Sequence, residues 1–511
     1  MKTRQLLGVT IVMLVLPLCS SQAAGVQPQT ETFDLATHRL VIADYLNHYA
    51  NPWTQGWSSD EWDGWSYNGC GITHHPRLSS NGTWTDLASK YHPLIGPYDA
   101  SDEAVLRYQI GLAKASGIDA FMIEWDGTSD FQDFPRVNSN SLKLLALAEK
   151  MVFGIVIGYD AGRYYTGSGG SFPPFLSNRT QILRLVHDDL AYAITRYGNS
   201  HIYLKYHGRP FIVLYNGVLT EFTHDEWNGI IDSLRKEGLD AFYATSNADG
   251  EALSYYPTVS GFFRWLPRSV LLGQSDSVTA IQEYAERLRS YGQSNSISLG
   301  IGVWPGFDSR PVAGWCPAGT PLTLLDDRRS GMEYNATWGA ALKANPDWIV
   351  IVTFNDWNEA TIVEPSTEFG YQYLYATAHF AAQYKNLRAS YDGISVPYVI
   401  YNATFAIRQA EKEGRTAGLE DAQSRLQEAE ESFDSGEYPV AAGQAEEAYQ
   451  LANGASIPSV VNFTSSQVSI NPNESIQSVE SPPYWSYLIP IVVGIVALAS
   501  IIRVIRKKSH R

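Results

Sequence analysis

The sequence has little basic charge outside its two ends, and this shortage excludes one class of protein. Its 37 Lys and Arg stand against 53 Asp and Glu, a net charge of −16, and seven of the bases lie at the chain ends. The part between is therefore strongly acidic, which argues against a nucleic-acid partner because phosphate neutralisation needs clustered bases. With 44% hydrophobic and 18% charged residues, the 511-residue chain is neither disordered nor collagen-like.

An extended apolar run lies near each end of the chain. Residues 1–24 predict a secretory signal peptide, in which Lys2 and Arg4 precede the apolar residues 6–18; a short membrane anchor is the alternative. Residues 485–505 predict one transmembrane helix, with aromatic residues before it and basic residues after it. Together they predict a single-pass protein of the cell membrane, with its N-terminal part extracellular and residues 506–511 as a cytoplasmic tail.

Cysteine is scarce as well. After removal of the signal peptide only Cys70 and Cys316 remain, and they either form one disulfide or stay as two buried thiols. Six Asn-x-Ser/Thr motifs fit an exported glycoprotein: Asn81, Asn178, Asn335, Asn402, Asn462 and Asn473.

Residues 38–385 alternate short apolar runs with amphipathic stretches. The expected strands are 40–46, 120–125, 152–159, 211–215, 241–245, 259–264, 298–304 and 348–354, and the expected helices include 102–116, 142–150, 178–196, 224–237, 278–291 and 332–343. Eight such units predict an α/β fold, the (β/α)8 TIM barrel. A doubly wound sheet is the alternative, but no glycine-rich phosphate loop opens any of the helices.

Beyond the barrel, residues 405–455 place Ala and Glu at helical spacing around a break at 435–439, which predicts a small helical hairpin. We interpret it as a spacer, with a partner-binding module as the alternative. Residues 456–483 are rich in Ser, Asn, Val and Pro, and predict a linker before the transmembrane helix.

Polar and aromatic residues follow nearly every expected strand, where a barrel builds its active site. The candidate substrate-binding residues are His48, Trp53, Glu124, Trp125, Asp160, Tyr215, Asn216, Trp265, Trp304, Asn355 and Trp357. The apolar faces of sugar rings stack on aromatic side chains, so this set favours a glycan ligand; packing in the core is the alternative for each aromatic residue.

The segment 349–366 carries the sharpest signal. An apolar strand leads into Asp356 and Glu359, two carboxylates three residues apart at the expected mouth of the barrel. Glycosidases need such a pair, one acid to protonate the leaving oxygen and one nucleophile or base. The same Asp-x-x-Glu spacing also fits the cap of a helix.

Around this pair the sequence resembles the glycoside hydrolase family 99 endo-α-mannosidases and their wider relatives. The matching motifs cover the barrel: residues 45–49 with Trp53, 63–65, 96–102, 113–125, 304–310 and 355–361 with Glu364. The resemblance implies that Asp356 is the base that deprotonates the 2-hydroxyl of the substrate, giving an anhydro-sugar intermediate, and that Glu359 is the general acid/base. The family has a glutamate where this chain has Asp356, whose side chain is one methylene shorter.

The resulting expectation is an extracellular, membrane-anchored glycoside hydrolase that acts within α-linked, mannose-type glycans and needs no cofactor or catalytic metal. Endo action is implied by the family and by the long segment 50–93, which could wall a cleft. Two alternatives stay open, a degenerate barrel that binds cell-surface glycan without cutting it and a surface scaffold that docks partners through residues 405–455.

Overall fold

The structure is a computed structural model, and it describes residues 33–52, 62–80, 82–166, 176, 178–246, 250–292, 295–315 and 324–453. The predicted signal peptide (1–24), linker (456–483), transmembrane helix (485–505) and tail (506–511) lie outside these residues. Among the residues that are described, no helix is long and apolar enough to cross a membrane.

Eight parallel strands form a closed barrel. They are β1 (Leu40–Tyr45), β6 (Ala120–Trp125), β7 (Gly154–Tyr159), β9 (Arg209–Leu214), β10 (Phe242–Thr245), β11 (Gly261–Phe262), β12 (Ser298–Val303) and β15 (Trp348–Ile351). Each pairs with the next in this order, and β15 pairs with β1. This closure confirms the predicted barrel and excludes an open, doubly wound sheet.

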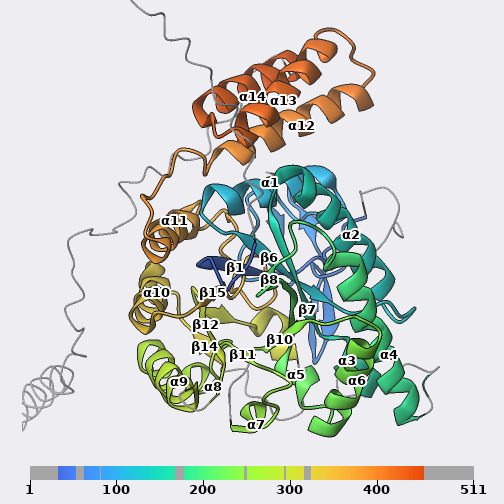
Figure 1. The fold of residues 1–511 in the computed structure, drawn as a ribbon. Helices are drawn as coiled ribbons and strands as arrows, with labels where there is room; N and C mark the ends of the chain where they lie inside the picture. The colour runs from blue at the N-terminus through green and yellow to red at the C-terminus, as the bar shows by residue number, and fades with distance from the viewer. Residues whose placement is uncertain are drawn as a thin grey trace, which may run out of the picture. The chain divides into compact units, whose positions relative to one another are not determined.

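Helices surround the strands (Figure 1). They are α1 (Glu103–Ala115), α2 (Phe134–Met151), α3 (Ala161–Thr166), α4 (Arg179–Tyr192), which continues as a π-helical turn over Ala193–Tyr197, α5 (Asn216–Leu219), α6 (His224–Lys236), α7 (Gly250–Leu253), α8 (Arg268–Leu271), α9 (Ser277–Gly292), α10 (Met332–Ala344) and α11 (Gln372–Lys385). Capping side chains define where two of these helices begin. Asp102 caps α1, and Thr223 with Glu226 forms a capping box at α6.

Additional short strands lie in the segments that connect the barrel strands and helices. The segment between β1 and α1 holds two hairpins, β2 (Tyr67–Gly69) with β3 (Ile72–His74) and β4 (Arg77–Leu78) with β5 (Trp84–Thr85). β8 (Lys205–Tyr206) runs antiparallel to β9, and β13 (Phe307–Asp308) pairs with β14 (Leu325–Asp326). Two 3₁₀ segments span Arg310–Trp315 and Arg329–Gly331.

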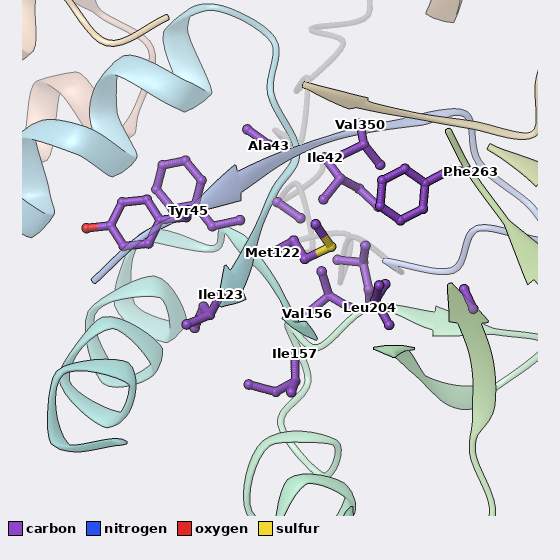
Figure 2. Packing of buried hydrophobic residues seen from close by; sticks show 14 of the residues in the cluster. Ile42, Ala43, Tyr45, Met122, Ile123, Val156, Ile157, Leu204, Phe263 and Val350 are labelled. Atoms are coloured by element: carbon purple, nitrogen blue, oxygen red, sulfur yellow. The ribbon is translucent and has the colours of Figure 1, made fainter. Parts of the chain in front are cut away.

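The register of the strands decides which residues fill the barrel. Ile42 pairs with Val350 and Asp44 pairs with Met122, so these four side chains share the inner face. Figure 2 shows Ile42, Met122 and Val350 directed into the barrel near Phe263, whereas Tyr45 and Ile123 point outward. The inner face of the barrel is thus apolar at Ile42, Met122 and Val350. Asp44 and Glu124 lie two positions further along β1 and β6, toward the carboxyl ends of these strands.

The chain beyond α11 corrects the predicted hairpin of residues 405–455. It forms three helices, α12 (Val396–Lys412), α13 (Leu419–Asp434) and α14 (Tyr438–Asn453). The predicted break at 435–439 separates α13 from α14, but α12 begins nine residues earlier than 405. Its first turns pack Val396 and Ile400 against Phe433 of α13, which makes this stretch part of the bundle.

Candidate active site

Three carboxylates from different strands meet at the carboxyl end of the barrel. Asp44 and Glu124 follow Ile42 and Met122 on the inner face of β1 and β6, and Asp356 lies in the loop after β15. They are close enough that the charge of Glu124 raises the pKa of both Asp44 and Asp356. A polar site therefore lies where the fold of a TIM barrel places its chemistry.

Asp356 is held by its own loop. Its backbone N–H donates to Thr353 Oγ1 at 2.8 Å, and its Oδ1 accepts the backbone N–H of Glu359 at 2.9 Å. Burial is the main cause that raises its pKa to about 7; the N–H of Glu359 lowers it and the Glu124 carboxylate raises it. A carboxyl with this pKa can take up or release a proton near neutral pH.

The predicted capping interaction is partly present. Asp356 accepts the N–H three residues ahead, as a cap does, but the residues that follow form a single turn over 357–360 and not a helix. Glu359 is half-buried, and its carbonyl accepts the backbone N–H of Asp308 at 2.8 Å. Lys90 and Arg310 hold the Asp308 carboxylate in turn, at 2.7 Å and 2.5 Å. The turn thus positions both members of the pair.

Asn355 and Trp357 lie beneath the site and do not line it. Asn355 bonds both backbone groups of Leu46 at 2.8 Å, which ties the end of β1 to the loop after β15. The Trp357 indole is 0% exposed and donates to Tyr98 Oη and to Glu364 Oε2, each at 3.1 Å. Both side chains are fully buried in this structure, and their predicted role in substrate binding stays a prediction.

Trp125 and Trp304 are fully buried as well, each 0% exposed. The Trp125 indole donates to Asn138 Oδ1 at 3.1 Å behind β6, and the Trp304 indole donates to Asp326 Oδ2 at 2.8 Å. In this structure these two residues and Trp357 pack in the core, the alternative noted for each aromatic residue, and contact with a sugar stays a prediction for them.

Tyr215 and Trp265 remain near the carboxylates. Tyr215 follows Val213, which pairs with Gly158, and its ring fills the space above that glycine: a Cβ there would lie 2.8 Å from Tyr215 Cε2. Trp265 is half-buried and meets Tyr215 edge-on, with ring centroids 5.7 Å apart. The two rings form an aromatic corner, and Asp160 lies near enough to raise the pKa of Tyr215.

The remaining predicted substrate-binding residues differ in their surroundings. Glu124 is half-buried, and within the described part of the chain no group hydrogen-bonds its carboxylate, which is therefore available to a ligand. His48 is half-buried and stacks on Tyr49 at 4.5 Å. Trp53 and the side chain of Asn216 lie outside the described residues.

The structure describes one of the two cysteines that were predicted to pair or to stay as thiols. Cys70 is disulfide-bonded, so it is not a free thiol, and Cys316 lies outside the described residues. The described residues contain no group of three or more His, Cys, Asp or Glu side chains placed to hold a metal ion.

Asp44 is the residue that sequence reasoning missed. It is 0% exposed, and its Oδ1 accepts the Tyr215 hydroxyl at 2.5 Å. The available signal was an acid inside an otherwise apolar strand, Leu40–Tyr45, because acidic side chains are almost never fully buried unless they are paired.

A closed (β/α)8 barrel with several carboxylates at the carboxyl ends of its strands is an architecture of glycoside hydrolases. The chain belongs to glycosyl hydrolase family 99, whose family model matches residues 36–391. This confirms the resemblance drawn from the sequence motifs.

Curated relatives are distant. The chain is 22% identical to a human glycoprotein endo-alpha-1,2-mannosidase-like protein over 291 residues, 55% of this chain and 58% of that protein. It is 21% identical to the rat glycoprotein endo-alpha-1,2-mannosidase over 349 residues, 64% of this chain and 67% of that enzyme. The match to the human protein thus spans less than two thirds of its length.

The solved structure of the family 99 endo-alpha-mannosidase from Bacteroides thetaiotaomicron shares the fold. Its TM-score is 0.51 at 20% sequence identity, covering 68% of this chain and 98% of that one.

Proposed function

We propose that the protein is an endo-acting glycoside hydrolase that cleaves α-linked, mannose-type glycans, with Asp356 as base and Glu359 as general acid/base. The observation that carries the proposal is the Asp356 carboxyl. It lies among other carboxylates at the mouth of the barrel, only 8% exposed and with a pKa raised to about 7, chiefly by burial. A base works best when its pKa lies near the working pH.

Other observations support the substrate class and the mode of action. Glu124 and the aromatic corner of Tyr215 and Trp265 offer a carboxylate and two ring edges beside the pair. The hairpins β2/β3 and β4/β5 extend the segment after β1, and a wall of this kind suits a cleft that accepts internal parts of a chain. The mannose-type specificity rests on membership of family 99.

We also propose that the barrel works outside the cell, held to the membrane by residues 485–505. The sequence of the two chain ends supports this, with aromatic residues before and basic residues after the apolar run. Protease treatment of intact cells tests it: the barrel should be released from the cells while the tail, residues 506–511, stays with them.

Hydrolysis of α-mannan by the wild type, Asp356→Asn and Glu359→Gln tests the catalytic pair. Each variant should lose at least about 10²-fold in kcat, because each removes proton transfer at the reacting centre. Glu446→Gln is the matched control, an exposed Glu-to-Gln change on α14 that should leave kcat unchanged. Hydrolysis that survives Glu359→Gln unchanged would contradict the assignment.

A glycan-binding protein without catalysis is the second candidate, favoured by the hydrogen bond that engages Asp356 Oδ1 in its own turn. Product analysis after long incubation separates the two. A binder retards the polysaccharide in a gel but releases no oligosaccharide from it.

A further inference from the structure

We propose that Asp44 is a neutral, protonated acid in the working protein, and that it acts as a positioning residue for the aromatic corner above it without adding a third charge beside Glu124 and Asp356. The inference rests on the proposed function for its effect on hydrolysis, but the protonation state can be measured without any activity.

Among the described residues, no cation lies beside Asp44 to balance a negative charge. The groups that face it are Glu124 from β6, Asp356 from the loop after β15 and Tyr215 from the loop after β9. No lysine, arginine or histidine of the described residues forms an ion pair with it. A buried carboxylate without a cation is costly, and two further carboxylates beside it increase the cost.

The hydrogen bonds of Asp44 indicate where the proton resides. Oδ1 accepts the Tyr215 hydroxyl at 2.5 Å, whereas the fully buried Oδ2 has no hydrogen-bond partner. A carboxylate would leave a charged oxygen buried and unpaired, whereas a protonated carboxyl carries its hydrogen on Oδ2 and is uncharged. Burial and the charges of Glu124 and Asp356 raise the pKa of Asp44 well above its usual value, although hydrogen bonds from the Tyr215 hydroxyl and the Tyr45 backbone N–H lower it.

A neutral Asp44 has two consequences for the site. Its Oδ1 holds the Tyr215 ring in the space above Gly158, and this orients the corner that Tyr215 forms with Trp265. It also adds no third negative charge beside Glu124 and Asp356, so Asp356 can lose its proton near neutral pH. An ionised Asp44 would make that deprotonation harder.

Asp44→Asn tests the protonation state, because asparagine is a neutral copy of a protonated aspartate. Its Oδ1 can accept from Tyr215, and its Nδ2 replaces the Oδ2–H. We expect kcat on α-mannan within about threefold of wild type, and the acidic limb of the pH–kcat/KM profile, set by Asp356, at an unchanged pH. Asp44→Ala removes the acceptor of the Tyr215 hydroxyl and should lower kcat by about tenfold or more.

Glu124→Gln is the matched comparison, since it removes a charge that does act on Asp356. It should move the acidic limb to lower pH by about one unit, because losing a nearby negative charge lowers the pKa of Asp356. A shift of that size in Asp44→Asn, or a loss of activity as large as in Asp44→Ala, would overturn the proposal.

Infrared spectroscopy provides the readout that does not depend on hydrolysis. At about pH 8 the carboxyls of Asp356 and Glu364, whose pKa values are about 7, are largely ionised. The difference spectrum between wild type and Asp44→Asn should then contain the C=O stretch of a protonated carboxyl. A carboxylate band there would refute the protonation of Asp44, whereas absence of hydrolysis with this band present would refute the proposed function alone.

Discussion

At the scale of single residues, Glu364 illustrates what burial does to a charge beneath the site. Its Oε2 accepts from Tyr98 Oη at 2.8 Å and from Trp357 Nε1 at 3.1 Å, and its Oε1 accepts from Gln109 Nε2 at 2.9 Å. Burial raises its pKa to about 7, although these three donors lower it. The folded protein therefore keeps a proton on Glu364 at a pH where the unfolded chain has released it.

This difference predicts how stability depends on pH. Because the pKa of Glu364 rises from 4.5 to about 7 on folding, the folded state binds more protons in this interval, and the free energy of unfolding falls as pH rises. The full loss is about 3 kcal/mol. Glu364→Gln cannot titrate, and rotation of the Gln109 amide can satisfy the new side-chain amide, so its stability should decline less between pH 4.5 and 7.

Urea unfolding at several pH values measures this effect as the difference between wild type and variant. Glu446→Gln, on the exposed face of α14, should keep the wild-type dependence. Parallel curves for wild type and Glu364→Gln would contradict the prediction.

At the scale of elements, the loop 355–364 has no helix or strand of its own, and a neighbouring loop holds it. Arg328 is buried and donates through Nη2 to the carbonyls of Ala360 and Ile362, at 2.7 Å and 2.8 Å. The rings of Tyr91, Phe369 and Tyr373 surround its guanidinium group, with centroids 5.0, 5.1 and 4.5 Å away. One buried cation thus sets the path of the loop that carries Asp356 and Glu359.

Arg328→Lys should therefore impair catalysis through the backbone. A lysine keeps the charge, but its flexible ammonium lacks the rigid plane of the guanidinium group, which stacks among the three rings and so holds Nη2 at both carbonyls. A displacement of the loop by about 1 Å should lower kcat by about 10²-fold, with a smaller effect on KM. Kinetics on α-mannan check this, and Arg388→Lys, at an exposed position, is the control. An unchanged kcat in Arg328→Lys would show that the loop keeps its path without the guanidinium group.

The elements also show what the sequence could and could not predict. All eight barrel strands were predictable because parallel strands buried on both faces read as short apolar runs. The start of α2 was not: the prediction began at 142 and the helix begins at Phe134. Its first turns hold Arg136, Asn140 and Ser141, buried polar residues that bond the segment after β1 and so interrupt the apolar pattern.

Of the three carboxylates at the mouth of the barrel, the sequence pointed to Glu124 and Asp356 and missed Asp44, and the aromatic residues were harder to interpret. Tryptophans after strands are ambiguous because a sugar face and a packed core both favour them, and only burial separates Trp265 from Trp125, Trp304 and Trp357. Asp44 could not be recognised as a partner of Tyr215, since the two are 171 positions apart and meet only when the barrel closes.

At the scale of the whole molecule, the bundle of α12, α13 and α14 is packed against α1 of the barrel. Gly111 in the middle of α1 allows the close approach, because a Cβ there would lie 2.9 Å from Pro397 Cγ and 3.4 Å from Phe433 Cε1. Ion pairs flank this contact, Arg107 with Glu430 at 3.2 Å and Arg408 with Asp102 at 2.8 Å. These pairs are only partly buried and such pairs add little, so the packing of Pro397 and Phe433 at Gly111 carries most of the contact.

Gly111→Leu should therefore loosen the bundle without affecting catalysis. The added side chain overpacks the contact at a cost of about 1–3 kcal/mol, which should lower the melting temperature by several degrees and speed proteolysis within 386–453. Gly443→Leu is the matched control, since this glycine of α14 has no atom within 4 Å of its added Cβ. Because a leucine favours a helix over a glycine by up to about 1 kcal/mol, the control should melt no lower than wild type. Equal melting temperatures and equal proteolysis in the two variants would mean that the bundle does not depend on its contact with α1, whereas a loss of α-mannan hydrolysis in Gly111→Leu alone would show that the bundle supports the barrel site.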